Sequence, residues 1–442
     1  MSFSGEQSSA PPPPPRAALA IVWLVVFIDL LGFGIVLPVM PRQAEPYLNV
    51  LGLAPEAKGA VIGILFSVFS LMQFVFSPVW GRISDRIGRK PVLLISLLGS
   101  VIFYALYGLA VSLPAEQGFL AIALLLLARV GAGIAGASVG TAAAVIADCT
   151  PPHKRARGMA LIGIAFGAGF TLGPLIAYFG LALFARQPWG VGALASLLSL
   201  GALLVAVAIF RETRNPGYQA GKDFFSVSRT LAVLKMPTVG VLILIYFLAI
   251  FAFANFEATL ALFTQSAFGM SDDDNFLVFA FVGAVLMVAG GVYRPLAKKH
   301  AELKLLARGV AMMILGLGCI GVIAYLTSSP RDSVDGGLKA LFYGAAALSV
   351  SGFAFTNPSV SALVSKRADP ARQGEVLGVN QAFASLGRIL GPFLGSVLFQ
   401  AEASRTLPYI AAVVTLVVVV ALVARIGQPH SAAPTADPAR TC

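Results

Sequence analysis

The chain has 442 residues, of which 58% are hydrophobic and only 12% are charged. Soluble proteins carry about 25% charged residues, so this chain has too little charge to cover a soluble fold of its size, which argues against a cytosolic enzyme. Apolar residues fill most of the length, which also excludes a collagen, a coiled coil and a disordered chain. We therefore expect most of its surface to lie in a lipid bilayer.

The cysteines indicate neither a metal site nor a disulfide framework. Cys149, Cys319 and Cys442 are far apart, and no CxxC motif or Cys/His cluster accompanies them. The sequence also lacks a GxxxxGK[ST] phosphate-binding loop. We therefore expect no metal and no cofactor.

Apolar stretches long enough to cross a bilayer recur along the chain. A spanning helix needs about 20 mostly apolar residues, and the sequence contains twelve such stretches. They are residues 17–40, 60–80, 91–112, 118–147, 159–183, 189–210, 237–264, 275–293, 306–326, 339–363, 376–400 and 406–426. The first has no clear cleavage site, so we read it as a spanning helix and not as a signal peptide. The predicted fold class is an all-α membrane protein with twelve transmembrane helices and no large soluble domain.

A long-period repeat divides the spans into two halves of six. Asp148 to Pro174 and Ala368 to Pro392 share basic residues before a glycine, an apolar helix and a Gly-Pro pair. Repeated halves are typical of transporters with a substrate site between the halves near the middle of the membrane, although a duplication without mechanistic meaning is an alternative. The expected parts are a disordered tail (1–16), a six-helix bundle (17–210), a cytoplasmic linker (211–236), a second six-helix bundle (237–426) and a second tail (427–442).

The basic residues predict the orientation. An even number of spans places both termini on one side, and with the termini inside, the inner segments hold 23 of the 31 Lys and Arg residues and the outer segments hold six. By the positive-inside rule both termini face the cytoplasm, in the cell (inner) membrane. The net charge of +11 is thus a topology signal and does not indicate a nucleic-acid partner.

Four segments resemble signature motifs of one transporter family. Gly81 to Lys90 (GRISDRIGRK), Ala128 to Ala137 (ARVGAGIAGA) and Gly167 to Pro174 (GAGFTLGP) resemble motifs A, B and C of the major facilitator superfamily. Val25 to Pro41 resembles helix 1 of its drug/proton antiporters, tetracycline exporters included. The resemblance covers essentially the whole chain. It implies the major facilitator fold, alternating access and exchange of a small molecule for protons.

The chain departs from the family pattern in three places. Ala177 and Tyr178 stand where motif C normally ends in glycines, and Ala132 stands where motif B has Gln. The acidic residue that tetracycline exporters carry in helix 3 is absent from 91–112. The resemblance therefore implies antiport but does not extend to a tetracycline substrate.

Four charged residues lie within the predicted spans and clear of their ends, where charge is costly and is functional by default. Asp29 and Glu257 occupy the first helix of each half, and we predict that they bind protons in competition with substrate. The resemblance implicates Arg129 in proton transfer, with Asp29 as its partner. We place Arg388 in the substrate cavity. The alternative for each is a static interhelical contact.

The remaining candidate residues form three groups. Polar and aromatic side chains within the spans are predicted to line a substrate cavity with Arg388: Phe33, Gln73, Tyr104, Asn255, Asn380 and Gln381. The resemblance implies a cytoplasmic gate, with Asp85 facing the start of helix 11, for the motif A cluster: Gly81, Asp85, Arg86, Gly88, Arg89, Lys90 and Asp148. Hinge or packing positions are predicted in helices 5 and 11: Gly169, Gly173, Pro174, Gly387, Gly391 and Pro392.

These patterns predict a monomeric secondary transporter, driven by the proton gradient, that exports small amphipathic or cationic compounds in the manner of drug and antibiotic efflux. A proton-driven importer or a uniporter of a metabolite is one alternative. A membrane sensor or scaffold that does not transport is an alternative from another class. An enzyme is not indicated, because the spans contain no HExxH motif, Ser/His pair or paired carboxylates one turn apart, so no catalytic residue is assigned.

Overall fold

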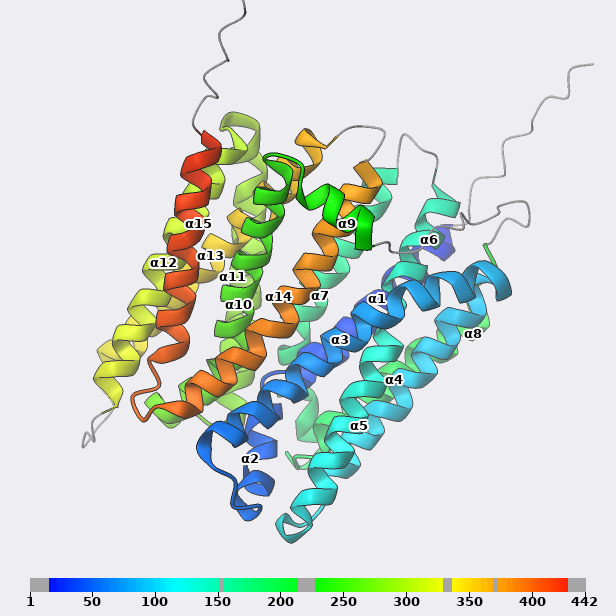
Figure 1. Ribbon diagram of the computed structural model, residues 1–442. Coiled ribbons are helices and arrows are strands. Elements are labelled where there is room, and N and C mark those ends of the chain that lie inside the picture. The colour runs from blue at the N-terminus through cyan, green and yellow to red at the C-terminus, as the bar shows by residue number, and fades with distance from the viewer. Residues whose placement is uncertain (1–15, 151–154, 214–226, 329–335, 369–372, 428–442) are drawn as a thin grey trace, which may run out of the picture. The chain divides into compact units, whose positions relative to one another are not determined.

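The computed structural model describes residues 16–150, 155–213, 227–328, 336–368 and 373–427. Within these ranges the chain forms helices and no strands (Figure 1). Twelve of the described helices are long and apolar enough to cross a membrane, which confirms the predicted fold class. The predicted tails, and residues 214–226 of the predicted linker, lie outside the described residues apart from Arg16 and Gly427 at the tail ends.

The helices follow the hydrophobic stretches closely. The helical elements are α1 (Arg16–Val36), α2 (Met40–Val50), α3 (Pro55–Ile87), α4 (Arg89–Val111), η1 (Ala115–Gln117), α5 (Gly118–Gly136), α6 (Val139–Cys149), α7 (Arg155–Gly180), η3 (Leu181–Phe184), α8 (Gly190–Ile209), α9 (Val227–Leu234), α10 (Val239–Phe268), α11 (Asp272–Lys299), α12 (Glu302–Thr327), α13 (Gly336–Arg367), α14 (Gln373–Ala401) and α15 (Leu407–Gly427). Most helices extend a few residues past the apolar stretch, because polar residues continue the helical backbone beyond the membrane.

Two predicted spans are interrupted. The stretch 17–40 leaves the helix after Val36, since Pro38 lacks an amide hydrogen, and α2 restarts with Pro41 in its first turn. The stretch 118–147 is two helices, α5 and α6, separated at Ala137 and Ser138. The short helix α9 within the predicted linker was also not expected.

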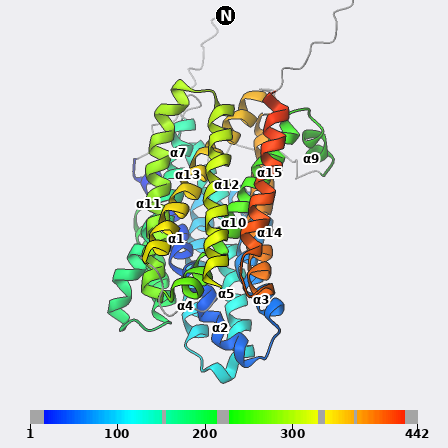
Figure 2. The ribbon, with the colours of Figure 1, turned by 90° about the vertical axis from the view of Figure 1, so that its left-hand side faces the viewer.

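The chain forms two compact units. Unit 1 consists of the described residues within 1–223, 258–287 and 392–401, and unit 2 of those within 224–257, 288–391 and 402–442. In unit 1, α4 packs against α5 and α8, and α1 packs against α7 (Figure 1). In unit 2, α12 packs against α13 and α15 (Figure 2). Helices α10, α11 and α14 each contribute to both units.

Glycines allow two of the closest helix contacts. In unit 1, a Cβ atom on Gly169 would lie 2.8 Å from the Leu30 Cβ, and one on Gly173 would lie 3.0 Å from the Gly34 carbonyl carbon. In unit 2, a Cβ atom on Gly391 would lie 2.6 Å from the Phe251 carbonyl oxygen of α10. Larger side chains would push these helices apart.

The predicted hinge positions therefore include tight packing sites. Gly387 also lies against α10, where its Cβ would be 3.0 Å from the Phe247 carbonyl oxygen. Pro174 lies within α7, and Pro392 lies within α14. Hinge motion at these positions stays a prediction.

Candidate functional site

Asp29 of α1 is buried in unit 1 among hydroxyl groups. Its side chain is 5% exposed, Oδ1 accepts a hydrogen bond from Ser100 Oγ (2.9 Å), and Oδ2 accepts one from Ser138 Oγ (3.2 Å). Ser100 comes from α4, and Ser138 lies in the break between α5 and α6. Two hydroxyl donors stabilise the ionised carboxylate in a place that water does not reach.

The break between α5 and α6 is supported by side chains of neighbouring helices. A helix that stops inside a bundle leaves carbonyl groups that need donors. Three side chains of α3 and α4 supply them: Trp80 Nε1 to Ile134 (2.7 Å), Ser96 Oγ to Ala135 (2.8 Å) and Gln73 Nε2 to Gly136 (3.2 Å). Gln73, a predicted cavity residue, thus helps to hold the end of α5, and its place in a cavity stays a prediction.

Arg129 of α5 is buried without a carboxylate partner. It is 2% exposed, and its Nε donates to the Leu65 carbonyl (2.9 Å). The guanidinium lies over the rings of Phe69 (4.5 Å) and Phe33 (5.4 Å), and Nη2 has no hydrogen-bond partner. Both Arg129 and Asp29 are described, and no ion pair joins them. The structure therefore does not bring the predicted pair into direct contact.

Tyr104 of α4 lies between these two charges. Its hydroxyl is 3.5 Å from the backbone carbonyl of Asp29, and it interacts electrostatically with both Asp29 and Arg129. The Tyr104 ring occupies the space left by the missing side chain of Gly32. Tyr104 is 3% exposed, so it is part of the packed core around Asp29.

Unit 2 holds the second pair of charged residues. Glu257 of α10 interacts electrostatically with Arg388 of α14, which also interacts with Tyr246. Glu257 Oε1 is buried without a hydrogen-bond partner, and Arg388 Nη2 donates to Ser385 Oγ (3.0 Å). Here the structure places a predicted proton-binding acid and a predicted cavity arginine near one another.

The other cavity candidates of unit 2 differ in exposure. Asn255 is fully buried, Asn380 is 4% exposed with an unpartnered Oδ1, and Gln381 is exposed. The ring of Phe253, on the same face of α10 as Glu257, stacks on Phe353 with centroids 3.9 Å apart. Aromatic faces and single polar atoms of this kind suit an amphipathic ligand.

The motif A residues form a compact charge cluster in unit 1. Arg89 Nη1 lies 2.6 Å from Asp85 Oδ1 and donates to Ser84 Oγ (2.6 Å), and Arg89 Nε lies 3.1 Å from Asp148 Oδ2. The Arg89 side chain is only 6% exposed. The two acids and the arginine of the predicted gate thus lie together. The predicted contact of Asp85 with the start of α14 involves unit 2 and stays a prediction.

Glu212 is a member of this cluster that the sequence did not indicate. It follows α8, and its carboxylate accepts from the backbone amides of Arg89 (2.8 Å) and Lys90 (3.0 Å) at the start of α4. Gly88 precedes them with φ +109°, a conformation that favours glycine, and a Cβ atom there would collide with Glu212. An acid at the start of a helix is favoured by the helix dipole.

The other glycine and basic residues of motif A have looser surroundings. A Cβ atom on Gly81 would meet nothing within 4 Å, so packing does not require glycine there. Arg86 is exposed, and Lys90 Nζ donates to the Val207 carbonyl (3.2 Å).

A second set of ion pairs in unit 1 involves the acidic start of α11. Arg42 Nη1 lies 2.7 Å from Asp272 Oδ1, and Arg186 pairs with Asp273. By the alternation of the spans this set lies on the side of the membrane opposite to the motif A cluster. Both arginines are among the six basic residues of the predicted outer segments, and their partners could not be predicted because the acids follow α10 without a recognisable motif.

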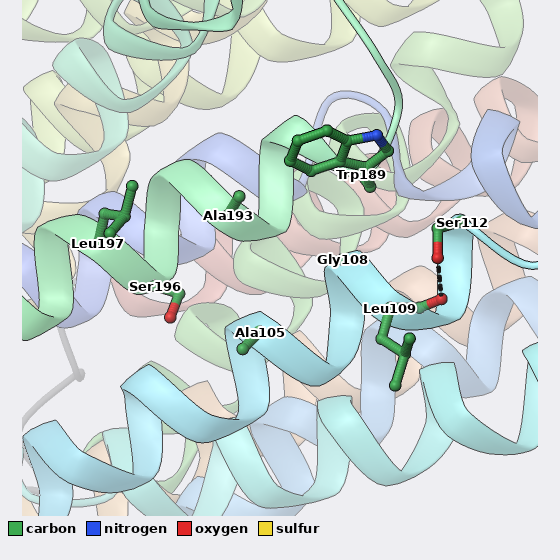
Figure 3. A pocket seen from close by; sticks show the side chains of 8 residues that line it. All are labelled: Ala105, Gly108, Leu109, Ser112, Trp189, Ala193, Ser196 and Leu197. Carbon is green, nitrogen blue, oxygen red and sulfur yellow. Dashed lines mark hydrogen bonds between the residues drawn. The ribbon is translucent and has the colours of Figure 1, made fainter. Parts of the chain in front are cut away.

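A cavity of about 580 Å³ opens between α4 and α8. Figure 3 shows its lining, which is mostly small or apolar: Ala105, Gly108, Leu109, Ser112, Trp189, Ala193, Ser196 and Leu197. Leu109 and Leu197 are each 55% exposed, so the cavity faces outward from the helices. None of the predicted site residues lines it.

Twelve helices long and apolar enough to cross a membrane, with a charged residue inside four of them, are typical of a membrane transport protein. The profile of the Major Facilitator Superfamily matches residues 22–379 and 308–441 of the sequence, and the chain belongs to this superfamily. It is accordingly a transporter of small molecules in a membrane and not an enzyme.

Relatives of the chain are found in a mammal and in bacteria. The chain is 29% identical over 434 residues to Major facilitator superfamily domain-containing protein 10 of Bos taurus, covering 87% of this chain and 88% of the relative. It is 29% identical over 389 residues to the class E tetracycline resistance protein of Escherichia coli, covering 86% and 87%.

Solved structures share the fold. The human organic anion transporter MFSD10 (TETRAN) matches with a TM-score of 0.62 and 24% identity, covering 94% of this chain and all of that chain. A D-xylose-proton symporter matches with a TM-score of 0.71 and 19% identity, covering 92% and 97%. At these identities the likeness shows the fold alone.

Proposed function

We propose that the protein exports small amphipathic or cationic compounds in exchange for protons, by alternating access. The observation that carries the proposal is the buried carboxylate of Asp29, held by the hydroxyls of Ser100 and Ser138. A buried ionisable group in a spanning helix marks an ion or substrate pathway. Glu257 of unit 2, which is intermediate in exposure but has a buried and unpartnered Oε1, is the second proton-binding group.

The residues present suit such an exchange. When ionised, Asp29 is held by two hydroxyls, and a proton would neutralise the charge and weaken both hydrogen bonds. A cationic group of the substrate would stabilise the same ionised form, so proton and substrate compete for one carboxylate. Within unit 2, Phe253 and the amide of Asn380 offer the apolar and polar contacts of an amphipathic ligand.

The tetracycline resistance proteins among the relatives support this proposal. The tetracycline resistance proteins of classes E and B are relatives at 29% and 28% identity, which supports efflux and an antibiotic-resistance role. One similar structure is that of an organic anion transporter, so an anionic probe belongs in the test beside a cationic and a zwitterionic one. We propose further a monomer without a cofactor, in the cell (inner) membrane, with both termini in the cytoplasm and the motif A cluster as the cytoplasmic gate.

The test is transport by the purified full-length protein in proteoliposomes with an imposed proton gradient. The probes are ethidium (a cation), tetracycline (a zwitterion) and 1-naphthoate (an anion), with internal pH recorded at the same time. The proposal expects ethidium movement against a proton flux, lost in Asp29→Asn and kept in Glu116→Gln, which removes an exposed carboxylate. Probe and protons that move in the same direction would instead establish the importer alternative, and probe movement without proton flux would establish a uniporter.

A further inference from the structure

The short helix α6 contacts a charged site at each end. At its start, Ser138 Oγ donates to Asp29 Oδ2 (3.2 Å), and in its last turn Asp148 Oδ2 accepts from Arg89 Nε (3.1 Å). The helix has 11 residues, which is about 16 Å at 1.5 Å per residue. One short rigid element therefore touches both the buried carboxylate and the motif A cluster.

The break before α6 separates it mechanically from α5. The last carbonyls of α5 are fixed by side chains of α3 and α4, as described above. The amides of Ala137 and Ser138 donate to the carbonyls three residues earlier, those of Ile134 and Ala135 (both 3.3 Å). The hydrogen bond from the Ala142 amide to the Ser138 carbonyl (2.9 Å) has the four-residue spacing of a regular α-helix. Interrupted ladders are the places where membrane helices change direction. The interruption is therefore the place at which α6 would change its direction relative to α5.

The buried face of α6 carries a spare hydroxyl. Thr141, one turn after Ser138 on the same face, is fully buried, and its Oγ1 has no hydrogen-bond partner. A buried hydroxyl without a partner costs stability. A shift of α6 by about 4.5 Å along its axis, three residues at 1.5 Å each, would bring Thr141 to the level that Ser138 occupies. The helix thus has the groups for a second hydrogen-bonded position.

We propose that α6 couples the two sites, with Ser138 as the positioning residue that transmits the state of Asp29 to the Arg89–Asp148 pair. An ionised Asp29 holds Ser138, and α6 keeps Asp148 on Arg89. A neutral Asp29 holds Ser138 more weakly, and α6 moves, which loosens the pair. The inference rests on the proposed function in taking Asp29 as a proton-binding group, and adds the route from that group to the motif A cluster.

Cys149 provides a reporter at the far end of α6. Its thiol is 6% exposed and directly follows Asp148. Burial, together with the Asp148 charge, raises the pKa of the Cys149 thiol to about 11. The thiol therefore reacts slowly with N-ethylmaleimide while α6 keeps its present position. In full-length protein carrying Cys319→Ser and Cys442→Ser, the alkylation rate of Cys149 therefore reports on the release of α6.

The experiment is a double-mutant cycle at one fixed pH. Asp29→Asn, which mimics the neutral acid, is expected to raise the alkylation rate about fivefold to tenfold, as expected from weakening one charge-assisted hydrogen bond. Ser138→Ala should raise it to a similar level, and adding Asp29→Asn to Ser138→Ala should change it no further. Ser100→Ala is the matched control. It removes another hydroxyl donor to Asp29, one that lies on α4, so the effect of Asp29→Asn should persist in that background.

Equal effects of Ser100→Ala and Ser138→Ala, or additive effects of Asp29→Asn and Ser138→Ala, would overturn the inference. If Asp29→Asn does not fold, the inference is tested by the alkylation rate of Cys149 in Ser138→Ala compared with that in Ser100→Ala. The three transport probes are measured on the same preparations. Proton-coupled flux together with an additive cycle would support the proposed function and rule out coupling through α6. A non-additive cycle without proton-coupled flux would support coupling through α6 and contradict the proposed function.

Discussion

The two buried acid and arginine sets are built differently. In unit 1, Asp29 is held by serine hydroxyls and Arg129 by a carbonyl and two aromatic rings, and the two charges do not pair. In unit 2, Glu257 has an unpartnered oxygen and is near enough to Arg388 to interact with its charge, although no ion pair joins these two described residues. An acid and an arginine in each of the repeated halves thus give one site in which serine hydroxyls hold the acid and one in which the acid has a neighbouring charge.

This difference suggests a division of labour. A carboxylate that accepts hydrogen bonds from neutral hydroxyl groups loses strength in those bonds when it is protonated, which suits a switch. A carboxylate opposite an arginine, with an oxygen still free, suits a place where a ligand group completes the arrangement. The predictions below test that division.

The largest expected effect is on proton coupling. Asp29→Asn should lower proton-coupled transport of the moved probe by about 100-fold, the typical contribution of a positioned proton-transfer group, whereas Glu257→Gln should lower it by about tenfold. Both rates are measured in proteoliposomes at equal protein incorporation. A larger loss in Glu257→Gln than in Asp29→Asn would reverse the assignment of the two sites.

The next effect is on pairwise coupling. A thermal-unfolding double-mutant cycle of Glu257→Gln with Arg388→Gln should give an interaction energy of about 1 kcal/mol, because each charge is the other's neighbour. The cycle of Asp29→Asn with Arg129→Gln should give less than about 0.5 kcal/mol, because no ion pair joins them. Equal values would show that the surroundings of the two sets are equivalent.

Serine substitutions should destabilise unit 1 more than unit 2. Ser138→Ala and Ser100→Ala each leave a buried carboxylate oxygen without a donor and should cost about 1–2 kcal/mol in the free energy of unfolding. Ser385→Ala removes the hydroxyl that Arg388 contacts at 3.0 Å, and its half-exposed surroundings should limit the cost to about 0.5 kcal/mol. Chemical unfolding in detergent measures all three, and a costlier Ser385→Ala would contradict the contrast.

The smallest effect is expected at Asn380. Its Oδ1 is buried without a partner, so Asn380→Leu removes an uncompensated polar atom and should change the free energy of unfolding by less than about 1 kcal/mol. Binding of the transported probe should nevertheless weaken if Asn380 contacts ligand. A large loss of stability with unchanged binding would place Asn380 in the structural core instead.

Much of the fold could be predicted from the sequence. The spans are long, apolar and bounded by loop charges, so their number and approximate ends follow from hydropathy alone. The break at Ala137 and Ser138 could not be predicted, because no proline marks it and its supports, Trp80 and Ser96, come from other helices.

The candidate site was predictable only in part. Asp29 and Glu257 are conspicuous because charges are rare within the spans, and the Arg89 cluster followed from a motif. The serines around Asp29 gave no signal, since hydroxyl residues are common in membrane helices. The pairing of Arg129 was expected to be ionic, and only the packing of Phe33 and Phe69 shows how a buried guanidinium is held without an acid.

The most direct test of the central claim is infrared difference spectroscopy of the carboxyl groups when the transported probe, ethidium in the first instance, binds to purified protein. The account predicts that binding removes the signal of a protonated carboxyl group, and that most of this change is absent in Asp29→Asn and retained in Glu116→Gln. An unchanged difference signal in Asp29→Asn would contradict the assignment of Asp29 as the group that exchanges a proton for substrate.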